Sequence, residues 1–205
     1  EVLGVNVDLC PMTDDHVATI VHCEKEDSEG DEKTIEPMAF QHYFVRDRCQ
    51  PTVTGFSFEG MDSARPSDKF IAALESKNLG SILICPSNPF VSVDPVLKLP
   101  GILEAMKKSP APVIAVSPIV GGQAIKGPAA KMMAELGMPA SALAVAKHYQ
   151  GRIDGFVIDE ADADLKDEIQ GLGIPTIVTK SVMVTLEDRI SLAEAVLEFA
   201  DELAS

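Results

Sequence analysis

The stretch PVIAVSPIVGGQAIKGPAAKMM, residues 112–133, holds a short apolar run, two glycines, a Lys-Gly-Pro step and an alanine- and methionine-rich segment. The apolar run is rich in Val and Ile and does not alternate with polar residues, which is typical of a parallel strand buried on both faces. Proline fits the first turn of a helix, so the segment after Gly127 predicts a helix. We therefore expect a strand, a glycine turn and a helix in succession.

The same order recurs along residues 67–205. Three further apolar runs, at residues 81–86, 155–160 and 175–180, resemble buried strands, and helix-like segments lie between them. The last segment, roughly 186–204, carries apolar residues at helical spacing behind Thr185, a candidate N-cap. Strands and helices that alternate in this way predict right-handed crossovers. The expected fold class is α/β, with a Rossmann-like, doubly wound and mostly parallel sheet.

Residues 1–66 follow a different pattern, and we expect them to be the end of a smaller insertion or connecting region. VATIVHCE (17–24) and PTVTGFSFEG (51–60) suggest strands, and EPMAFQHYFVRDRC (36–49) suggests a short helix with aromatic anchors. Residues 24–36, EKEDSEGDEKTIE, hold seven acids and two lysines. That segment predicts a flexible acidic loop, because it has little apolar surface to bury.

Composition excludes several classes of protein. The net charge is −15, of which −5 lies in residues 24–36 and −10 in residues 153–205. We see no basic stripe and no set of stacking aromatics, so we expect no nucleic-acid partner. No apolar run approaches the length of a membrane span, and four cysteines without metal-ligand spacing suggest reduced thiols. We expect a cytoplasmic protein with no membrane partner.

Two loops that follow predicted strands are candidates for phosphate binding, because ligands of parallel sheets bind beyond the carboxyl ends of the strands. Ser87 and Asn88 follow the first of these strands and could donate hydrogen bonds to phosphate oxygens. After the second, glycines allow either close backbone approach to a ligand or a positive φ, a lysine adds a positive charge, and a helix begins. A plain strand-to-helix turn is the alternative, and the Lys-Gly-Pro order is not a Walker A loop. The candidate residues of this second loop are Gly121, Gly122, Lys126 and Gly127.

Weaker candidates lie elsewhere in the chain. Asp14 and Asp15 could hold a metal with substrate phosphates, but an exposed turn with a helix-capping aspartate explains them better. Arg46 and Arg48 would face one way on a strand and could clamp an anion, or they could be a solvated pair. The acids of VIDEADAD (157–164) are better explained as helix-start residues. No catalytic residue can be assigned, since no Ser-His-Asp or Cys-His set assembles.

Six segments along the chain are, in order, PMTDD, FQHYFVRDRCQPTV, FEGMDSARPS, ICPSNPFVSVDPVLKLPGI, SPIVGGQAIKGPAAKMMAELG and GFVIDEADA. Together they resemble segments of the 2-phospho-L-lactate transferases (LPPG:Fo 2-phospho-L-lactate transferase, CofD-like), so the resemblance covers nearly the whole chain. It implies transfer of a phospholactyl or phosphoenolpyruvyl-type group from a guanosine diphosphate adduct to the ribityl hydroxyl of the deazaflavin Fo. GMP would leave, and Mg²⁺ and a homodimer are expected.

One departure from the family pattern limits what the resemblance implies about the activity of this chain. The family's N-terminal glycine-rich loop and its acidic metal-binding motif have no counterpart in these residues, so the resemblance implies the C-terminal portion of the enzyme. We expect this portion to be inactive alone, with the metal ligands in the N-terminal segment that it lacks. A non-catalytic regulator that senses a uridine or adenine nucleotide sugar on the same fold is the alternative. A dinucleotide-dependent oxidoreductase is disfavoured, because no GxGxxG motif is present.

Overall fold

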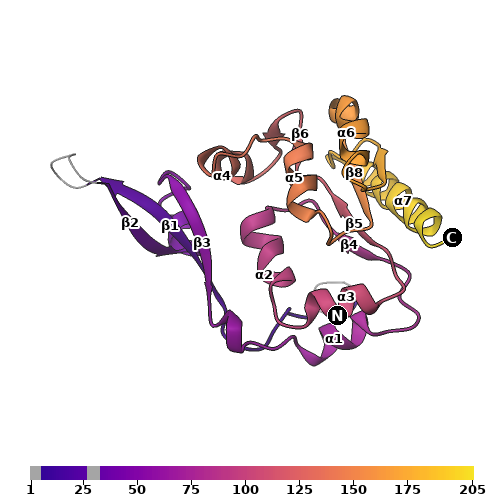
Figure 1. The fold of residues 1–205 in the computed structure, drawn as a ribbon, viewed down its shortest axis with the longest axis horizontal. Helices are drawn as coiled ribbons and strands as arrows, with labels where there is room; N and C mark the ends of the chain where they lie inside the picture. The colour runs from indigo at the N-terminus through magenta and orange to yellow at the C-terminus, as the bar shows by residue number, and fades with distance from the viewer. Residues whose placement is uncertain (1–5, 27–32) are drawn as a thin grey trace.

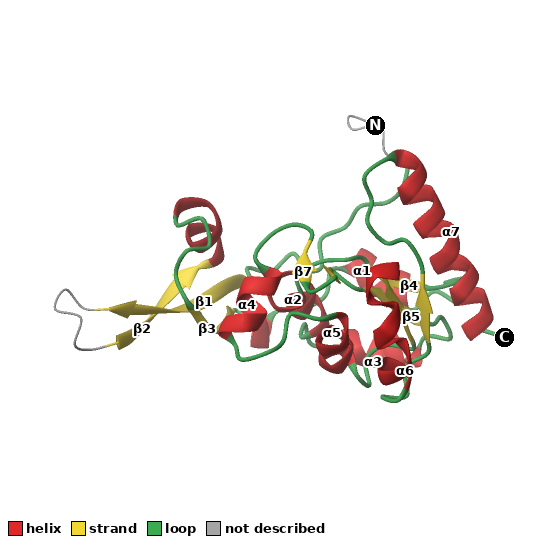
Figure 2. Ribbon diagram, turned by 90° about the horizontal axis from the view of Figure 1, so that it is seen from above, coloured by secondary structure: helices red, strands yellow, loops and turns green. Residues whose placement is uncertain are grey.

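The computed structural model describes residues 6–26 and 33–205. A three-stranded antiparallel sheet forms an arm at one end of the molecule, and an α/β unit forms the rest (Figure 1). Seen from above, the arm projects away from the α/β unit, and the last helix lies at the far end (Figure 2). One large apolar cluster includes residues of both parts, among them Val21 and Tyr43 from the arm. The predicted boundary near residue 66 stays a prediction.

The centre of the α/β unit is a four-stranded parallel sheet in the order β4-β5-β8-β9. Every residue of β5 and β8 is buried, which confirms the prediction of strands covered on both faces. β4 is an edge strand among the described residues, and its Leu83 is 41% exposed. The strands are β4 (Ile82–Ile84), β5 (Val113–Val116), β8 (Gly155–Ile158) and β9 (Thr176–Val178).

Helices cover both faces of this sheet, which confirms the α/β doubly wound class. The crossover helices pack with one large core, whereas α7 (Leu186–Leu203) packs on the other face of β5 and β8. Pro100 and a left-handed Gly101 separate two short helices, Asp94–Leu97 and Ile102–Lys108, within the helix-like segment between β4 and β5. The shorter helices are α1 (Asp68–Leu74), α2 (Asp94–Leu97), α3 (Ile102–Lys108), α4 (Ala129–Glu135), α5 (Ala142–Tyr149) and α6 (Lys166–Gln170).

The start of α7 confirms the predicted N-cap. The Thr185 hydroxyl accepts a hydrogen bond from the Asp188 N–H at 3.2 Å, and an Asp188 carboxylate oxygen accepts one from the Thr185 N–H at 2.8 Å. This reciprocal pair satisfies two donors that a helix otherwise leaves open at its start. The Lys180 ammonium, 2.6 Å from Asp188, and these hydrogen bonds hold the pKa of the Asp188 carboxyl well below its usual range.

The arm confirms two predicted strands and corrects the prediction for the acidic segment. β1 (Ala18–Glu26) pairs antiparallel with β2 (Lys33–Ala39) on one side and with β3 (Val53–Glu59) on the other. Residues 24–26 and 33–36 were expected in a flexible loop, but they continue the β1–β2 ladder. Cross-strand ion pairs, Lys25–Glu36 at 2.8 Å and Lys33–Glu24 at 2.9 Å, offset the acidity there. Residues 27–32 lie outside the described part.

Short turns complete the chain. The helix predicted within residues 36–49 is a single π-helical turn, His42–Arg46, and its Tyr43 is fully buried. Across residues 6–26 and 33–205, no helix is both long and apolar enough to cross a membrane. The remaining elements are the turns Met61–Ser63, Pro89–Val93 and Glu160–Leu165, and the two-residue strands β6 (Ile119–Val120) and β7 (Gln123–Ala124).

Candidate functional site

A cavity of about 480 Å³ lies beyond the carboxyl ends of the parallel strands, where α/β sheets bind ligands. The loops after β4, β5 and β9 line it, together with the segment that leads into α4 and two aromatic rings from the arm. The lining residues used below are Phe40, Phe44, Ser87, Asn88, Lys126, Gly127 and the loop 181–183. Four of the six residues predicted from the sequence therefore meet at one cavity.

The loop after β4 brings Ser87 and Asn88 to the cavity, but the two side chains differ in whether they already form hydrogen bonds within the protein. The Asn88 side-chain oxygen accepts hydrogen bonds from the N–H groups of Phe90 at 3.0 Å and Val91 at 3.4 Å. Asn88 thus begins the Pro89–Val93 turn, and its amide nitrogen lies 3.2 Å from the Met132 sulfur. The Ser87 hydroxyl has no hydrogen-bond partner among the described residues, so it is free to donate to a ligand.

Gly121 and Gly122 form the turn between β6 and β7, and neither lines the cavity. Their φ angles are +56° and +76°, which favour glycine because a side chain would be strained there. The sequence offered two uses for these glycines, close backbone approach to a ligand or a positive φ, and the structure confirms the positive φ. In the structure their conformational freedom serves the hairpin turn instead.

Lys126 and Gly127 follow that hairpin and do line the cavity. The Lys126 side chain is exposed and forms no ion pair with any described residue. Gly127 has a φ of +74° and is followed by Pro128, after which α4 begins without a side-chain cap. An uncompensated ammonium and uncapped N–H groups therefore lie on the same side of the cavity, an arrangement that favours an anion.

Two aromatic rings from the arm also line the cavity. Phe40 and Phe44 are stacked, with ring centroids 5.5 Å apart and planes 25° from parallel, and Phe44 is 45% exposed. The sequence identified aromatic anchors in this segment but did not place them at the ligand site. Their spacing of four residues, which puts two side chains on one face of a helical turn, was the available signal.

The loop 181–183 is the other part of the cavity that the sequence did not foresee. Asp159, 7% exposed, accepts hydrogen bonds from the Ser181 N–H at 2.7 Å, the Ser181 hydroxyl at 3.0 Å and the Ala161 N–H at 3.1 Å. Burial raises the pKa of the Asp159 carboxyl, but these hydrogen bonds outweigh it and leave the pKa below its ordinary value. Asp159 is therefore an ionised anchor for this loop.

The two weaker aspartate candidates lie away from the cavity. Asp15 accepts a hydrogen bond from the Arg65 N–H at 2.8 Å, and its own N–H donates to the Thr13 hydroxyl at 3.0 Å. Asp14 is exposed, and neither aspartate lines the cavity. The exposed turn that the sequence offered as the second explanation fits this arrangement.

The two arginine candidates do not lie on a strand, so the shared face that a strand would give them does not form. Arg46 ends the π-helical turn and pairs with the neighbouring Asp47 at 2.7 Å. Arg48 lies in the next turn with a left-handed φ of +49°. The buried Tyr43 pins this segment against the core, and that contact favours a tight turn over an extended strand. Both arginines line a shallow depression apart from the cavity.

The described side chains do not form a metal site. Within residues 6–26 and 33–205, no three His, Cys, Asp or Glu side chains gather so that they could hold a metal ion. Asp159, which anchors the loop beside the cavity, already accepts three hydrogen bonds from the protein. The described residues therefore do not fit a Mg²⁺ site of their own.

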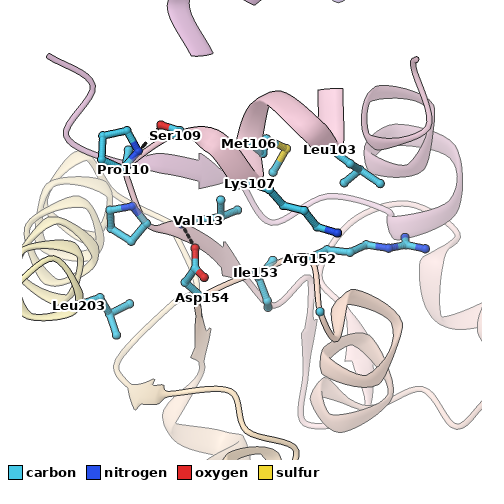
Figure 3. A pocket seen from close by; sticks show the side chains of 13 residues that line it. Leu103, Met106, Lys107, Ser109, Pro110, Val113, Arg152, Ile153, Asp154 and Leu203 are labelled. Atoms are coloured by element: carbon cyan, nitrogen blue, oxygen red, sulfur yellow. Dashed lines mark hydrogen bonds between the residues drawn. The ribbon is translucent and has the colours of Figure 1, made fainter. Parts of the chain in front are cut away.

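A second cavity, of about 460 Å³, lies at the opposite end of the sheet (Figure 3). Lys107 and Arg152 border it, and its Asp154 accepts a hydrogen bond from the Val113 N–H at 2.8 Å. Lys107 lies in the last turn of α3, where a cation interacts favourably with the helix dipole, so its presence there needs no ligand. The cavity at the carboxyl ends of the strands is the better candidate.

The chain is similar to proteins of a known family. A family model described as "2-phospho-L-lactate transferase CofD" matches residues 1–199. The chain is 36% identical over 195 residues to the 2-phospho-L-lactate transferase of Methanosarcina mazei, covering 95% of this chain and 60% of that relative. It is 35% identical over 198 residues to the phosphoenolpyruvate transferase of Streptomyces griseus, covering 96% of this chain and 60% of that relative.

Solved structures show the same fold at lower identity. The crystal structure of protein BH3568 from Bacillus halodurans matches with a TM-score of 0.59 at 17% identity, over 96% of this chain and 63% of that one. A second structure of that protein, described as a member of the UPF0052 family, matches with a TM-score of 0.58 at 18% identity, over 94% of this chain and 63% of that one. The chain spans about 60% of the length of the curated relatives that it matches.

Proposed function

Because the chain belongs to the 2-phospho-L-lactate transferase CofD family, we propose that it forms part of a transferase that acts on a guanosine diphosphate adduct. The reaction is transfer of a 2-phospho-L-lactate or phosphoenolpyruvyl-type group from this adduct (LPPG) to the deazaflavin Fo, with release of GMP, in coenzyme F-420 biosynthesis. Similar chains carry both transferase names, which supports the chemistry and leaves the transferred group open.

The step is an attack by a hydroxyl on a diphosphate. The ribityl hydroxyl oxygen of Fo bonds to the phosphorus that carries the lactyl group and gives up its proton to water. The bond from that phosphorus to the bridging oxygen breaks, and GMP leaves with that oxygen. A protein assists such a step mainly by holding the reactants in line and neutralising the charge that develops on the phosphates.

The observation that carries the proposal is an uncompensated lysine at the cavity beyond the strands. Lys126 forms no ion pair with any described residue, and Ser87, Gly127 and the start of α4 line the same space. We assign the diphosphate to this side, where the ammonium, a free hydroxyl and open backbone N–H groups meet an anion. The arm contributes the stacked rings of Phe40 and Phe44, against which we place a flat ring of the donor or acceptor.

Magnesium stays an expectation from the family. The described residues do not supply a set of ligands for the ion. What these residues do in the proposed reaction is bind the diphosphate, orient it and exclude water from one side of it.

Calorimetric titration of the chain with GDP, beside UDP at the same concentrations, tests the proposal. We expect GDP to bind and Lys126→Ala to weaken it by about tenfold or more, which is the scale for losing a hydrogen bond to a charged group. Lys107→Ala removes a lysine from the opposite cavity and should leave GDP binding unchanged. Equal losses of GDP affinity in both variants would argue against the assigned site. A preference for UDP would favour the alternative function, a non-catalytic regulator that senses a nucleotide sugar.

A further inference from the structure

Asp162 is a buried carboxylate without a cation. It is 5% exposed and lies in the 3-10 turn Glu160–Leu165, at a residue whose backbone (φ −113°, ψ 19°) leaves helical geometry. The N–H of Gly121, 41 residues earlier, lies 3.2 Å from one of its oxygens and 3.1 Å from the other. One backbone donor thus bridges both carboxylate oxygens.

The charges near Asp162 make its burial costly. No lysine, arginine or histidine among the described residues forms an ion pair with it. Burial raises the pKa of the Asp162 carboxyl, and the neighbouring carboxylates of Asp159 and Asp164 raise it further against the Gly121 hydrogen bond. A buried charge opposed by like charges destabilises a fold, so fold stability alone does not account for an aspartate here.

The group that Asp162 binds is the tip of the β6–β7 hairpin. Each of these strands has two residues, and such a short ribbon is marginal on its own. The base of the hairpin is fixed, because Ile119 is fully buried and its N–H and carbonyl both bond to the Ser117 hydroxyl. At the tip, Gly121 is exposed on a left-handed turn, and Asp162 accepts its N–H.

The far strand of this hairpin leads directly to the cavity. β7 ends at Ala124, and Ile125, Lys126 and Gly127 follow along the cavity wall. Neither Gly121 nor Asp162 lines the cavity itself, so Asp162 does not touch a ligand bound there.

We propose that Asp162 is a positioning residue: by accepting the Gly121 N–H it holds the β6–β7 hairpin and thereby sets the place of Lys126 at the cavity. The last link, from Lys126 to the nucleotide, rests on the proposed function. The first link, from Asp162 to the hairpin, does not.

Amide hydrogen exchange tests the first link. In Asp162→Ala we expect the Gly121 amide to exchange at least tenfold faster, while amides of the central strand β5 keep their protection. Asp162→Asn keeps an acceptor oxygen and should restore most of the protection. Glu168→Gln, an exposed acid on α6 that does not act on Asp162, is the control and should change nothing. Unchanged Gly121 exchange in Asp162→Ala, in a chain that keeps the β5 protection, overturns the proposal.

A double-mutant cycle with GDP as the probe tests the second link. Asp162→Ala should weaken GDP binding by about fivefold, on the scale of one hydrogen bond. In a Lys126→Ala background the same change should have almost no effect, because the two residues act in series. If Asp162→Ala lowers GDP affinity equally in the unmodified and the Lys126→Ala backgrounds, the link through Lys126 is overturned. Absence of GDP binding by the unmodified chain overturns the assigned diphosphate site and this link with it, while the exchange measurement still decides whether Asp162 holds the hairpin.

Discussion

Replacing Asp94 is the most informative perturbation of the fold. Asp94 is 4% exposed at the start of α2, and its carboxylate lies 2.9 Å from His148 Nε2, 3.3 Å from Lys98 Nζ and 3.6 Å from Arg152 Nη1. His148 lies on α5, so this carboxylate joins two crossover segments of the α/β unit. We expect Asp94→Ala to destabilise the chain well beyond an ordinary surface substitution.

The magnitude follows from how exposed each partner is. Removing one member of a buried ion pair costs about 3–5 kcal/mol when the partner stays buried. The Lys98 and Arg152 side chains are 48% and 34% exposed, so solvent screens them and each adds about 0–1 kcal/mol. The His148 side chain is 19% exposed, and a hydrogen bond between it and a charged group is worth about 1.5–3 kcal/mol. The free energy of unfolding should therefore fall by about 2–4 kcal/mol.

Urea unfolding followed by circular dichroism measures this loss. We expect a lower midpoint with an unchanged slope, and a melting temperature lower by roughly 4–16 °C for a chain of this length. Glu198→Gln, an exposed acid on α7, is the control and should stay within about 0.5 kcal/mol of the unmodified chain. A loss in Asp94→Ala no larger than in this control would refute the reasoning.

The dependence on pH gives a second check. Burial alone would raise the pKa of the Asp94 carboxyl, but His148 and Lys98 outweigh it and bring the pKa below its ordinary value. An acid with a lowered folded pKa contributes its full stability above its unfolded pKa and loses it as pH falls through the folded pKa. The difference between the unmodified chain and Asp94→Ala should therefore be largest near neutral pH and shrink in acid. A difference that grows in acid would contradict the assigned charge state.

Three further outcomes are expected in the same unfolding assay. Thr185→Ala removes the N-cap of α7 and should cost about 1 kcal/mol, whereas Thr185→Ser should cost little. Gly60→Ala should cost more than 2 kcal/mol, because φ is +80° and the new Cβ would fall 2.2 Å from the His16 carbonyl oxygen; near-native stability would exclude that clash. Ile114→Ala, in the fully buried β5, should cost about 2–5 kcal/mol, and Leu83→Ala on the half-exposed edge clearly less; equal losses would mean that β4 is not an edge.

The sequence was sufficient for the parts of the fold that depend on local periodicity. Apolar runs rich in Val and Ile predicted β5 and β8 as strands buried on both faces, and Thr185 predicted the start of α7. It failed at residues 24–26 and 33–36, where polar side chains form a β ladder. Cross-strand ion pairs stabilise that ladder, and such pairs join residues that no local pattern connects.

For the candidate site, the sequence determined which residue types could meet an anion, and tertiary structure decided which of them meet. Ser87 and Lys126 reach one cavity because the carboxyl ends of parallel strands lie at the same edge of the sheet. Gly121 does not line the cavity, because its N–H is bound by Asp162, and the loop 181–183 does, because Asp159 anchors it. Those hydrogen bonds join residues 41 and 22 positions apart, so they exist only once the chain has folded and brought them within reach.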